Sequence, residues 1–202
     1  MKLSKKYFPY ILCIIFILLV ISIWLFFLLK NDNDYLKVIF LDVGQGDAIY
    51  IEAPNGEQVL IDSGPDAKLL SSLSKVMPFA DRTINTIIAT HPDSDHIGAF
   101  SVFLDNYKVK NIVENGAVSN SKVFSNLEEK IIDKKINKII AKRGMRLILD
   151  KEKNIYLDIL FPDRDISDMD SNDGSIVGKL VYGETSFMLM GDASLYTENL
   201  IE

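Results

Sequence analysis

The sequence predicts a layered α/β domain of the α+β kind that follows one transmembrane helix. Three observations support this prediction. Residues 7–29 are apolar and uncharged. From residue 36 onwards, short strand-like segments alternate with segments of helical spacing. Both histidines of the chain lie in one loop, residues 91–96, together with two aspartates. The apolar segment predicts the anchor, the alternation predicts the domain class, and the loop predicts where the chemistry takes place.

The first element, residues 7–29, is long enough to cross a bilayer. It contains no charge, no glycine and one proline, and its 23 residues at about 1.5 Å each give roughly 34 Å of helix. A cleaved signal peptide would be shorter and would end in small residues, whereas this segment ends in Phe-Phe-Leu-Leu. Bulky residues precede Cys13, which disfavours a lipoprotein signal, and a buried core helix is rarely apolar on all sides. We therefore expect a membrane anchor.

The flanking charges predict how this anchor is oriented. Lys2, Lys5 and Lys6 precede it, whereas one lysine and then Asn-Asp-Asn-Asp follow it. Because Lys and Arg accumulate on the cytoplasmic side, the N-terminus is expected inside the cell and the remainder outside, in a single-pass protein of the cell membrane. The expected segments are a cytoplasmic terminus at 1–6, the span at 7–29, a spacer at 30–35 and an extracellular domain at 36–202.

Composition narrows the chemistry of this outer domain. The only cysteine, Cys13, lies in the span, so the domain has neither a disulfide nor a thiolate site. The net charge of −6 gives no general affinity for nucleic acid by charge alone, although a metal site would add its own positive charge. His, Asp, Glu, Ser and Lys therefore remain to carry any reaction.

Three short strands are expected first in the outer domain. Strand-like apolar patterns occur at residues 37–42, 47–52 and 58–62, and turns at 44–46 and 54–56 separate them. These signals predict an antiparallel meander.

Helices and strands alternate after the meander. A helix is expected at 67–77, closed by Pro78, and the almost continuous apolar segment 83–90 is typical of a strand buried on both faces. The other expected elements are helices at 97–107, 123–136 and 195–201 and strands at 109–113, 145–149, 155–161, 175–182 and 186–190. Hairpins mixed with helices favour a layered domain over a doubly wound sheet.

The loop His91-Pro92-Asp93-Ser94-Asp95-His96 is the clearest functional signal. It follows the buried strand directly, so His91 and Asp93 can face one metal ion while Asp95 and His96 face a neighbouring one. Imidazole and carboxylate ligands suit divalent ions such as zinc or manganese. The alternative is a helix cap formed by Ser94 or Asp95. Capping alone does not require both histidines of the chain, so we favour metal binding.

A second carboxylate, Asp192, lies at the end of an apolar strand after a glycine, where it is either a further ligand or an ordinary capping residue. Two other patterns are rejected. Gly44-Gln45-Gly46 lacks the third glycine of a dinucleotide loop, and the acidic segment 163–173 lacks the glycine and glutamate spacing of a calcium loop. That acidic segment is expected to be a solvated loop.

Five stretches of the sequence together resemble the metallo-β-lactamase-fold domain of ComEC-type competence proteins and their stand-alone relatives. They are residues 40–48, 60–64, 89–98, 172–177 and 187–192, in this order. The resemblance implies a four-layer αββα sandwich with two divalent metal ions, zinc or manganese, at one edge of its two sheets.

The resemblance also implies roles for individual residues. His91 and Asp93 would bind the first ion, and Asp95 and His96 the second, with Asp192 as the bridging carboxylate. Asp95 is in addition the candidate catalytic residue. The residues expected to be structural and near the site are Asp42, Gly44, Gly46, Asp47, Asp62, Asn172 and Ser175.

The implied activity is that of a membrane-anchored extracellular hydrolase that cuts nucleic-acid phosphodiesters with metal-activated water. Two alternatives remain: a hydrolase of small esters or lactam-like substrates, and an impaired fragment that acts as a binding or structural module. The second follows from the end of the chain, ten residues after Asp192 with no histidine beyond His96. We accordingly expect a truncated sandwich that holds the second ion weakly. The sequence specifies no oligomeric state.

Overall fold

The computed structural model describes residues 7–29 and 35–201. The chain divides into two compact units, residues 1–33 and 34–202. The charged residues Lys2, Lys5 and Lys6, residues 30–34 of the expected spacer and Glu202 lie outside the described residues.

The first unit contains helix α1, Phe8–Leu29, where the sequence predicts the span. Its segment Phe8–Phe26 has a mean hydropathy of 2.8. By length and composition, this N-terminal helix fits a single-pass membrane anchor.

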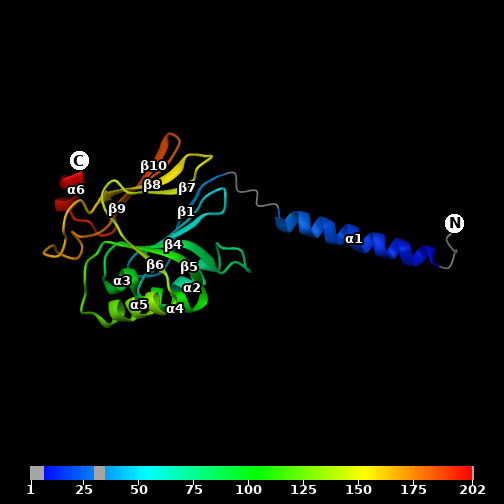
Figure 1. Cartoon of the computed structure of the whole chain (residues 1–202), viewed down its shortest axis with the longest axis horizontal. Helices are drawn as coiled ribbons and strands as arrows, with labels where there is room; N and C mark the ends of the chain where they lie inside the picture. Colours follow the sequence, from blue (N-terminus) through cyan, green and yellow to red (C-terminus); the bar gives the residue numbers. More distant parts are fainter. Residues whose placement is uncertain (1–6, 30–34, 202) are drawn as a thin grey trace. The chain divides into compact units, whose positions relative to one another are not determined.

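The second unit is built on two sheets (Figure 1). Sheet A has the strand order β1-β2-β3-β4-β5-β6. Its first three strands form the expected antiparallel meander, and β3 to β6 run parallel. The bounds are β1 Lys37–Phe40, β2 Ile49–Glu52, β3 Gln58–Ile61, β4 Thr83–Ala89, β5 Lys108–Glu114 and β6 Asn137–Ile140.

Sheet B is antiparallel, in the order β10-β9-β8-β7. Its bounds are β7 Arg146–Asp150, β8 Ile155–Phe161, β9 Val177–Tyr182 and β10 Thr185–Leu189. The helices of this unit are α2 Lys68–Leu73, α3 Ser94–Ile97, α4 Phe100–Asn106, α5 Lys122–Asp133 and α6 Leu195–Ile201.

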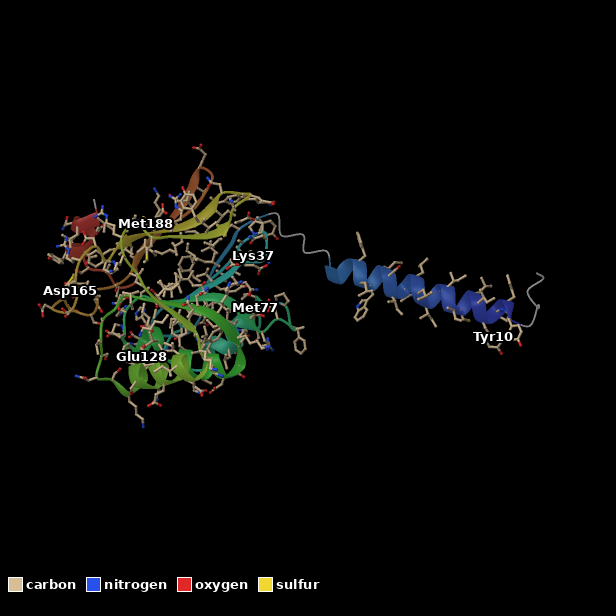
Figure 2. All side chains as sticks on the ribbon, in the orientation of Figure 1. Tyr10, Lys37, Met77, Glu128, Asp165 and Met188 are labelled. Atoms are coloured by element: carbon tan, nitrogen blue, oxygen red, sulfur yellow. The ribbon has the colours of Figure 1, made fainter. Side chains whose placement is uncertain are left out.

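Helices α2 to α5 lie on one side of sheet A, and sheet B lies on the other (Figure 1). Side chains fill the space between the layers (Figure 2). Strand β4 contributes to the packing on both of its faces. Ile87 belongs to the apolar cluster under the helices, and its neighbour Ile88 belongs to the cluster between the sheets. Successive side chains of a strand point to opposite faces, so a strand buried on both faces needs an unbroken apolar segment.

The sandwich fold is confirmed. Helix α6 packs through Leu200 and Ile201 against a small apolar cluster that includes Phe161 and Val177 of sheet B. The layered α/β class follows from apolar faces that must each be covered by another layer.

Three elements differ clearly from the sequence prediction. The helix expected at 67–77 is shorter, since α2 ends at Leu73. The helix expected at 97–107 is split into α3 and α4, and α3 already begins at Ser94. Strand β6, Asn137–Ile140, is not predicted, because only two of its four residues are apolar and it follows α5 closely. It is an edge strand of sheet A, where less burial is required.

Candidate metal centre

The loop after β4 places both histidines next to each other at the edge of sheet A where β4 ends. Only four residues separate helix α3 from the strand, and the last of them, Asp93, is the N-cap in an extended conformation. The carbonyl of Asp93 accepts hydrogen bonds from the backbone N–H groups of His96 and Ile97, both at 3.0 Å. This single helical turn places the rings of His91 and His96 with their centroids 4.1 Å apart.

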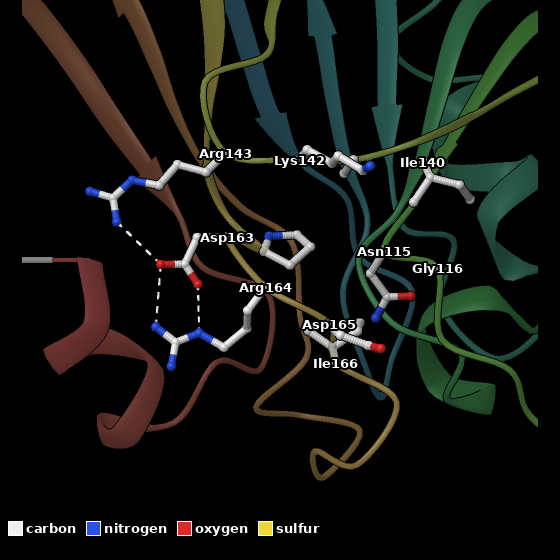
Figure 3. Close-up of a pocket in the computed structure, with 11 residues that line it drawn as sticks. Asn115, Gly116, Ile140, Lys142, Arg143, Asp163, Arg164, Asp165 and Ile166 are labelled. Carbon is white, nitrogen blue, oxygen red and sulfur yellow. Dashed lines mark hydrogen bonds and ion pairs between the residues drawn. The ribbon is translucent and has the colours of Figure 1, made fainter.

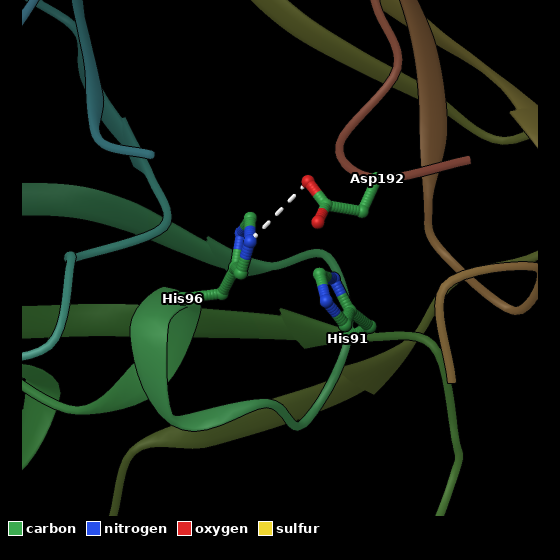
Figure 4. Close-up of side chains that lie close together, drawn as sticks. All are labelled: His91, His96 and Asp192. Carbon is green, nitrogen blue, oxygen red and sulfur yellow. Dashed lines mark ion pairs between the residues drawn. The ribbon is translucent and has the colours of Figure 1, made fainter. Parts of the chain in front are cut away.

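Asp192 joins the two histidines from the far end of the sequence. One ligand atom from each of His91, His96 and Asp192 lies within 4.8 Å of the others. Figure 4 shows the carboxylate turned toward His96, with Asp192 Oδ1 3.3 Å from His96 Nε2. Gly191 makes this approach possible: its φ is +53°, and a Cβ there would lie 3.1 Å from the side chain of Thr90.

Asp62 contacts the Nδ1 side of the His96 ring. The carboxylate oxygen Oδ2 of Asp62 lies 2.9 Å from His96 Nδ1, and both side chains are almost inaccessible. Asp62 also accepts hydrogen bonds from the backbone N–H of Thr90 at 2.8 Å and from its hydroxyl at 2.7 Å. Because Nδ1 of His96 contacts Asp62, Nε2 is the ring nitrogen that faces Asp192.

Two hydroxyl groups contact the Nδ1 atom of His91, as Asp62 contacts that of His96. Its Nδ1 lies 3.0 Å from Thr90 Oγ1 and 3.3 Å from Ser175 Oγ. Its Nε2 is buried and has no hydrogen-bond partner among the described residues. A buried ring nitrogen without a partner is costly, and a metal ion would satisfy it. The two Nε2 atoms and the nearby carboxylates therefore fit a divalent ion.

The pKa values of the two histidines are shifted in opposite directions. Burial and the neighbouring His96 lower the pKa of His91, which favours the neutral ring that a metal ion requires. Burial also lowers the pKa of His96, but the hydrogen bond and charge of Asp62, with Asp192 and Asp95, outweigh it and raise that pKa to about 9. Partial burial among acidic neighbours raises the pKa of Asp47.

The other two acidic residues of the loop lie outside the group of three. Asp93 Oδ2 is 3.7 Å from His91 Nε2, and its Oδ1 accepts a 2.7 Å hydrogen bond from Ser171. Asp95 is partly buried, and its charge contributes to the raised pKa values of His96 and Asp47. Both carboxylates are thus beside the histidines without converging as closely as Asp192.

The remaining predicted residues separate into those at the centre and those away from it. Asp62 and Ser175 contact the histidines, as described above, and Asp47 interacts with His96 through its charge. Asp42 does not: its side chain is 80% exposed and pairs with Lys68 at 2.5 Å.

Three more predicted residues act through the backbone. Gly44 and Gly46 have φ values of +92° and +72°, and Gly46 lies against the backbone of Asp95. The carbonyl of Asn172 accepts from the N–H of Ser175 at 3.0 Å, which shapes the turn that carries the serine.

Sequence reasoning missed Thr90 and Ser171. Thr90 contacts both Asp62 and His91, and its place between the buried strand and the first histidine was an available signal. Ser171 reaches Asp93 across 78 positions of sequence, so no local pattern could have indicated it.

Comparisons with known proteins agree with this architecture. The profile of the family described as "Metallo-beta-lactamase superfamily" matches residues 41–201. "ComE operon protein 3" of Bacillus subtilis is 30% identical, over 77% of this chain and 22% of its own length. The chain therefore spans about a fifth of that curated relative.

Solved structures support the fold. The metallo-beta-lactamase fold protein YhfI from Bacillus subtilis superposes with a TM-score of 0.51 at 12% identity, over 77% of this chain and 61% of that one. A metallo-beta-lactamase mutant from Cronobacter sakazakii also gives 0.51, at 16% identity, over 75% and 59%. The expected resemblance to ComEC-type proteins is confirmed, and the chain belongs to the metallo-beta-lactamase superfamily.

Proposed function

We propose that this chain is a membrane-anchored, metal-dependent hydrolase that cleaves nucleic-acid phosphodiesters outside the cell membrane. The observation that carries the proposal is the convergence of His91, His96 and Asp192, together with the buried Nε2 of His91, which has no hydrogen-bond partner among the described residues. The nucleic-acid substrate is supported by the relationship to ComE operon protein 3 and by the sequence resemblance to the competence branch.

The ligand assignment follows the family resemblance, and the convergence of the two histidines with Asp192 supports it. His91 with Asp93 would hold one ion, and His96 with Asp95 would hold another, both zinc or manganese. Asp192 would bridge them, since its ligand atom is within 4.8 Å of those of both histidines. Only three ligand groups among the described residues converge within 4.8 Å, so we expect one ion to be held well and the other more weakly.

Bound divalent ions would lower the pKa of water and neutralise the charge that develops on the phosphate. The residues of the chain prepare this site. Asp62 fixes the ring of His96, and Thr90 and Ser175 fix that of His91. Asp95 is the candidate catalytic residue, as the carboxylate that would position water beside His96. These fixed side chains would keep the ligand atoms oriented without reorganisation during the reaction.

The alternative of a binding or structural module has one observation in its favour. Only three residues, His91, His96 and Asp192, converge within 4.8 Å among the described residues, which is enough for one ion. Such a mononuclear centre would bind a metal and an anionic ligand without efficient turnover. Hydrolysis of small esters or lactam-like substrates shares the fold but has no observation of its own here.

The test is metal content together with phosphodiester hydrolysis. The full-length chain is purified in detergent, and zinc and manganese are measured by elemental analysis in the wild type and in a His91→Ala, His96→Ala variant. An Asp42→Asn variant is the matched control, because Asp42 is exposed and away from the cluster. We expect one to two ions per chain in the wild type and the control, and loss in the double variant.

Activity is then measured on bis(p-nitrophenyl) phosphate and on labelled single-stranded DNA. Metal-dependent cleavage that disappears in the double variant is expected. Equal metal content in all three proteins would contradict the assignment of His91 and His96 as metal ligands. Bound metal without cleavage of either substrate would favour the binding module.

A further inference from the structure

A second concave feature lies at the same edge of sheet A as the metal centre. It is a pocket of about 500 Å³ (Figure 3), which we call the arginine pocket. Residues that follow β5 and β6 line it, among them Asn115, Lys142 and Arg143. The segment 162–166, which follows β8, also lines the pocket.

Strand register places this pocket close to the metal centre. Ala89 of β4 is paired with Glu114 of β5, and Glu114 with Ile140 of β6. Neighbouring strands are about 4.8 Å apart, so the strand ends beside His91 and beside the pocket are separated by two spacings, about 10 Å. Asn115 lines both the arginine pocket and a small cavity that His91 also lines.

One loop, residues 162–176, connects the pocket to the metal centre. Its first part lines the pocket, and its last part supports His91 through Ser175 at 3.3 Å. The side-chain amide of Asn115 donates to the carbonyl of Gly174 at 2.9 Å and thereby ties this loop to the end of β5. A ligand seated in the pocket would therefore contact a loop that also shapes the catalytic edge.

The charges of the pocket favour an anion. Asp163 holds two guanidinium groups: Arg164 Nε lies 2.7 Å from Asp163 Oδ1, and Arg143 Nη1 lies 3.5 Å from Oδ2 (Figure 3). Lys142 is exposed, with no ion pair within the described part of the chain. The pocket is lined by three cationic side chains and by two carboxylates, those of Asp163 and Asp165. The cations are Lys142, Arg143 and Arg164, so the lining has a net charge of +1 in a chain whose net charge is −6.

We propose that the arginine pocket binds a backbone phosphate of the substrate strand, a few nucleotides from the bond cut at the metal centre. The proposal rests on the proposed function. Guanidinium groups recognise phosphate through paired N–H donors, and the shared Asp163 holds both arginines in place while Arg143 keeps most of its donors free. Each strand of B-DNA carries one phosphate per about 3.4 Å of helix axis, so about 10 Å corresponds to roughly three nucleotides in a duplex and to fewer in an extended single strand.

The metal centre itself explains why such a subsite is needed. Asp47, Asp62, Asp93, Asp95 and Asp192 surround the two histidines, and this acidic cluster repels a polyanion wherever metal ions do not neutralise it. Cationic side chains beside the cluster supply attraction that does not depend on the metal load. The pocket would thus set where along the strand the reacting phosphodiester lies.

The experiment measures binding of a fluorescein-labelled, 12-nucleotide single-stranded DNA to the full-length chain in detergent, by fluorescence anisotropy, with EDTA and again with Zn²⁺. The test variant is Lys142→Gln with Arg143→Gln. The matched control is Lys108→Gln with Lys110→Gln, which removes the same charge from exposed residues at the opposite end of β5. Zinc content and thermal melting of both variants report on their folding.

We expect the pocket variant to bind about tenfold more weakly than the wild type, with a salt slope smaller by roughly 0.7 for each phosphate that the variant no longer neutralises. The control should bind like the wild type. An oligonucleotide with an uncharged methylphosphonate backbone should bind weakly to all three proteins.

Equal affinity of the wild type and the pocket variant in both buffers would overturn the pocket assignment, as would a wild type that does not bind the oligonucleotide. Hydrolysis of bis(p-nitrophenyl) phosphate by the wild type is measured in parallel. If it occurs while the pocket has no effect on binding, the proposed function stands and this inference fails. If the pocket governs binding but no diester is hydrolysed, the proposed function fails and the phosphate site remains.

Discussion

The carboxylate of Asp62 and the Nδ1 atom of His96 lie 2.9 Å apart, and each side chain is no more than 2% exposed. Asp62 has a φ of +57°, a conformation that is uncommon outside glycine. Three hydrogen bonds hold it there, one from His96 and two from Thr90. Asp62 therefore orients a ring that the proposed metal ion would share.

This pair leads to a prediction for Asp62→Asn. The amide keeps the shape of the carboxylate but loses its charge and one strong acceptor, so His96 should be less basic and less firmly oriented. Loss of such a supporting carboxylate typically lowers metal affinity by about 10- to 100-fold. Zinc affinity is measured by competition with a chromogenic chelator. Asp42→Asn, an exposed carboxylate, is the control, and equal affinities in the two variants would contradict the role of Asp62.

Gly46 should tolerate no side chain. A Cβ at this position would lie 1.8 Å from the carbonyl oxygen of Asp95, and φ is +72°. We expect Gly46→Ala to lower the free energy of unfolding by roughly 3 kcal/mol or more, since the loop that carries the histidines must shift. Gly144→Ala is the matched control: φ is +89° but nothing lies within 4 Å, so only about 1 kcal/mol of strain is expected.

Thermal melting with and without chemical denaturant compares these two variants. A Gly46→Ala protein as stable as Gly144→Ala would show that the loop accommodates a methyl group without cost. Zinc content of the folded Gly46→Ala protein would then report whether the loop has moved.

Metal binding should stabilise the domain. An ion that binds only the folded state at about 100 times its Kd adds about 2.7 kcal/mol to the free energy of unfolding. For a domain of this size, that corresponds to a rise in Tm of about 5–10 °C. Differential scanning calorimetry of the full-length chain with Zn²⁺ and with EDTA measures the shift. Asp192→Asn should give a smaller shift than the wild type, and an undiminished shift would remove Asp192 from the ligand set.

The proposed membrane orientation is tested by protease access. An epitope tag on the C-terminus should be digested by protease added to intact cells, and a tag on the N-terminus should be protected until the cells are lysed. We expect this orientation because Lys2, Lys5 and Lys6 precede the span, and lysines accumulate on the cytoplasmic side of a membrane. Protection of the C-terminal tag with loss of the N-terminal one would reverse the topology.

Much of the fold follows from local patterns, as two segments show. The meander of β1 to β3 was predicted because glycine-containing turns interrupt apolar segments at short intervals. The burial of β4 was predicted because its apolar residues are almost continuous. Strand β6 was missed because its pairing with β5 comes from tertiary packing, which four residues of mixed polarity do not reveal.

The sequence by itself predicted that His91 and His96 lie close together, because both belong to one short loop between a strand and a helical turn. Only the tertiary structure decided what surrounds them. Asp62 meets His96 across 34 positions, and Ser175 meets His91 across 84. Such contacts arise where the ends of separate strands meet at one sheet edge, and that meeting is set by the packing of many apolar side chains between the layers rather than by any local pattern.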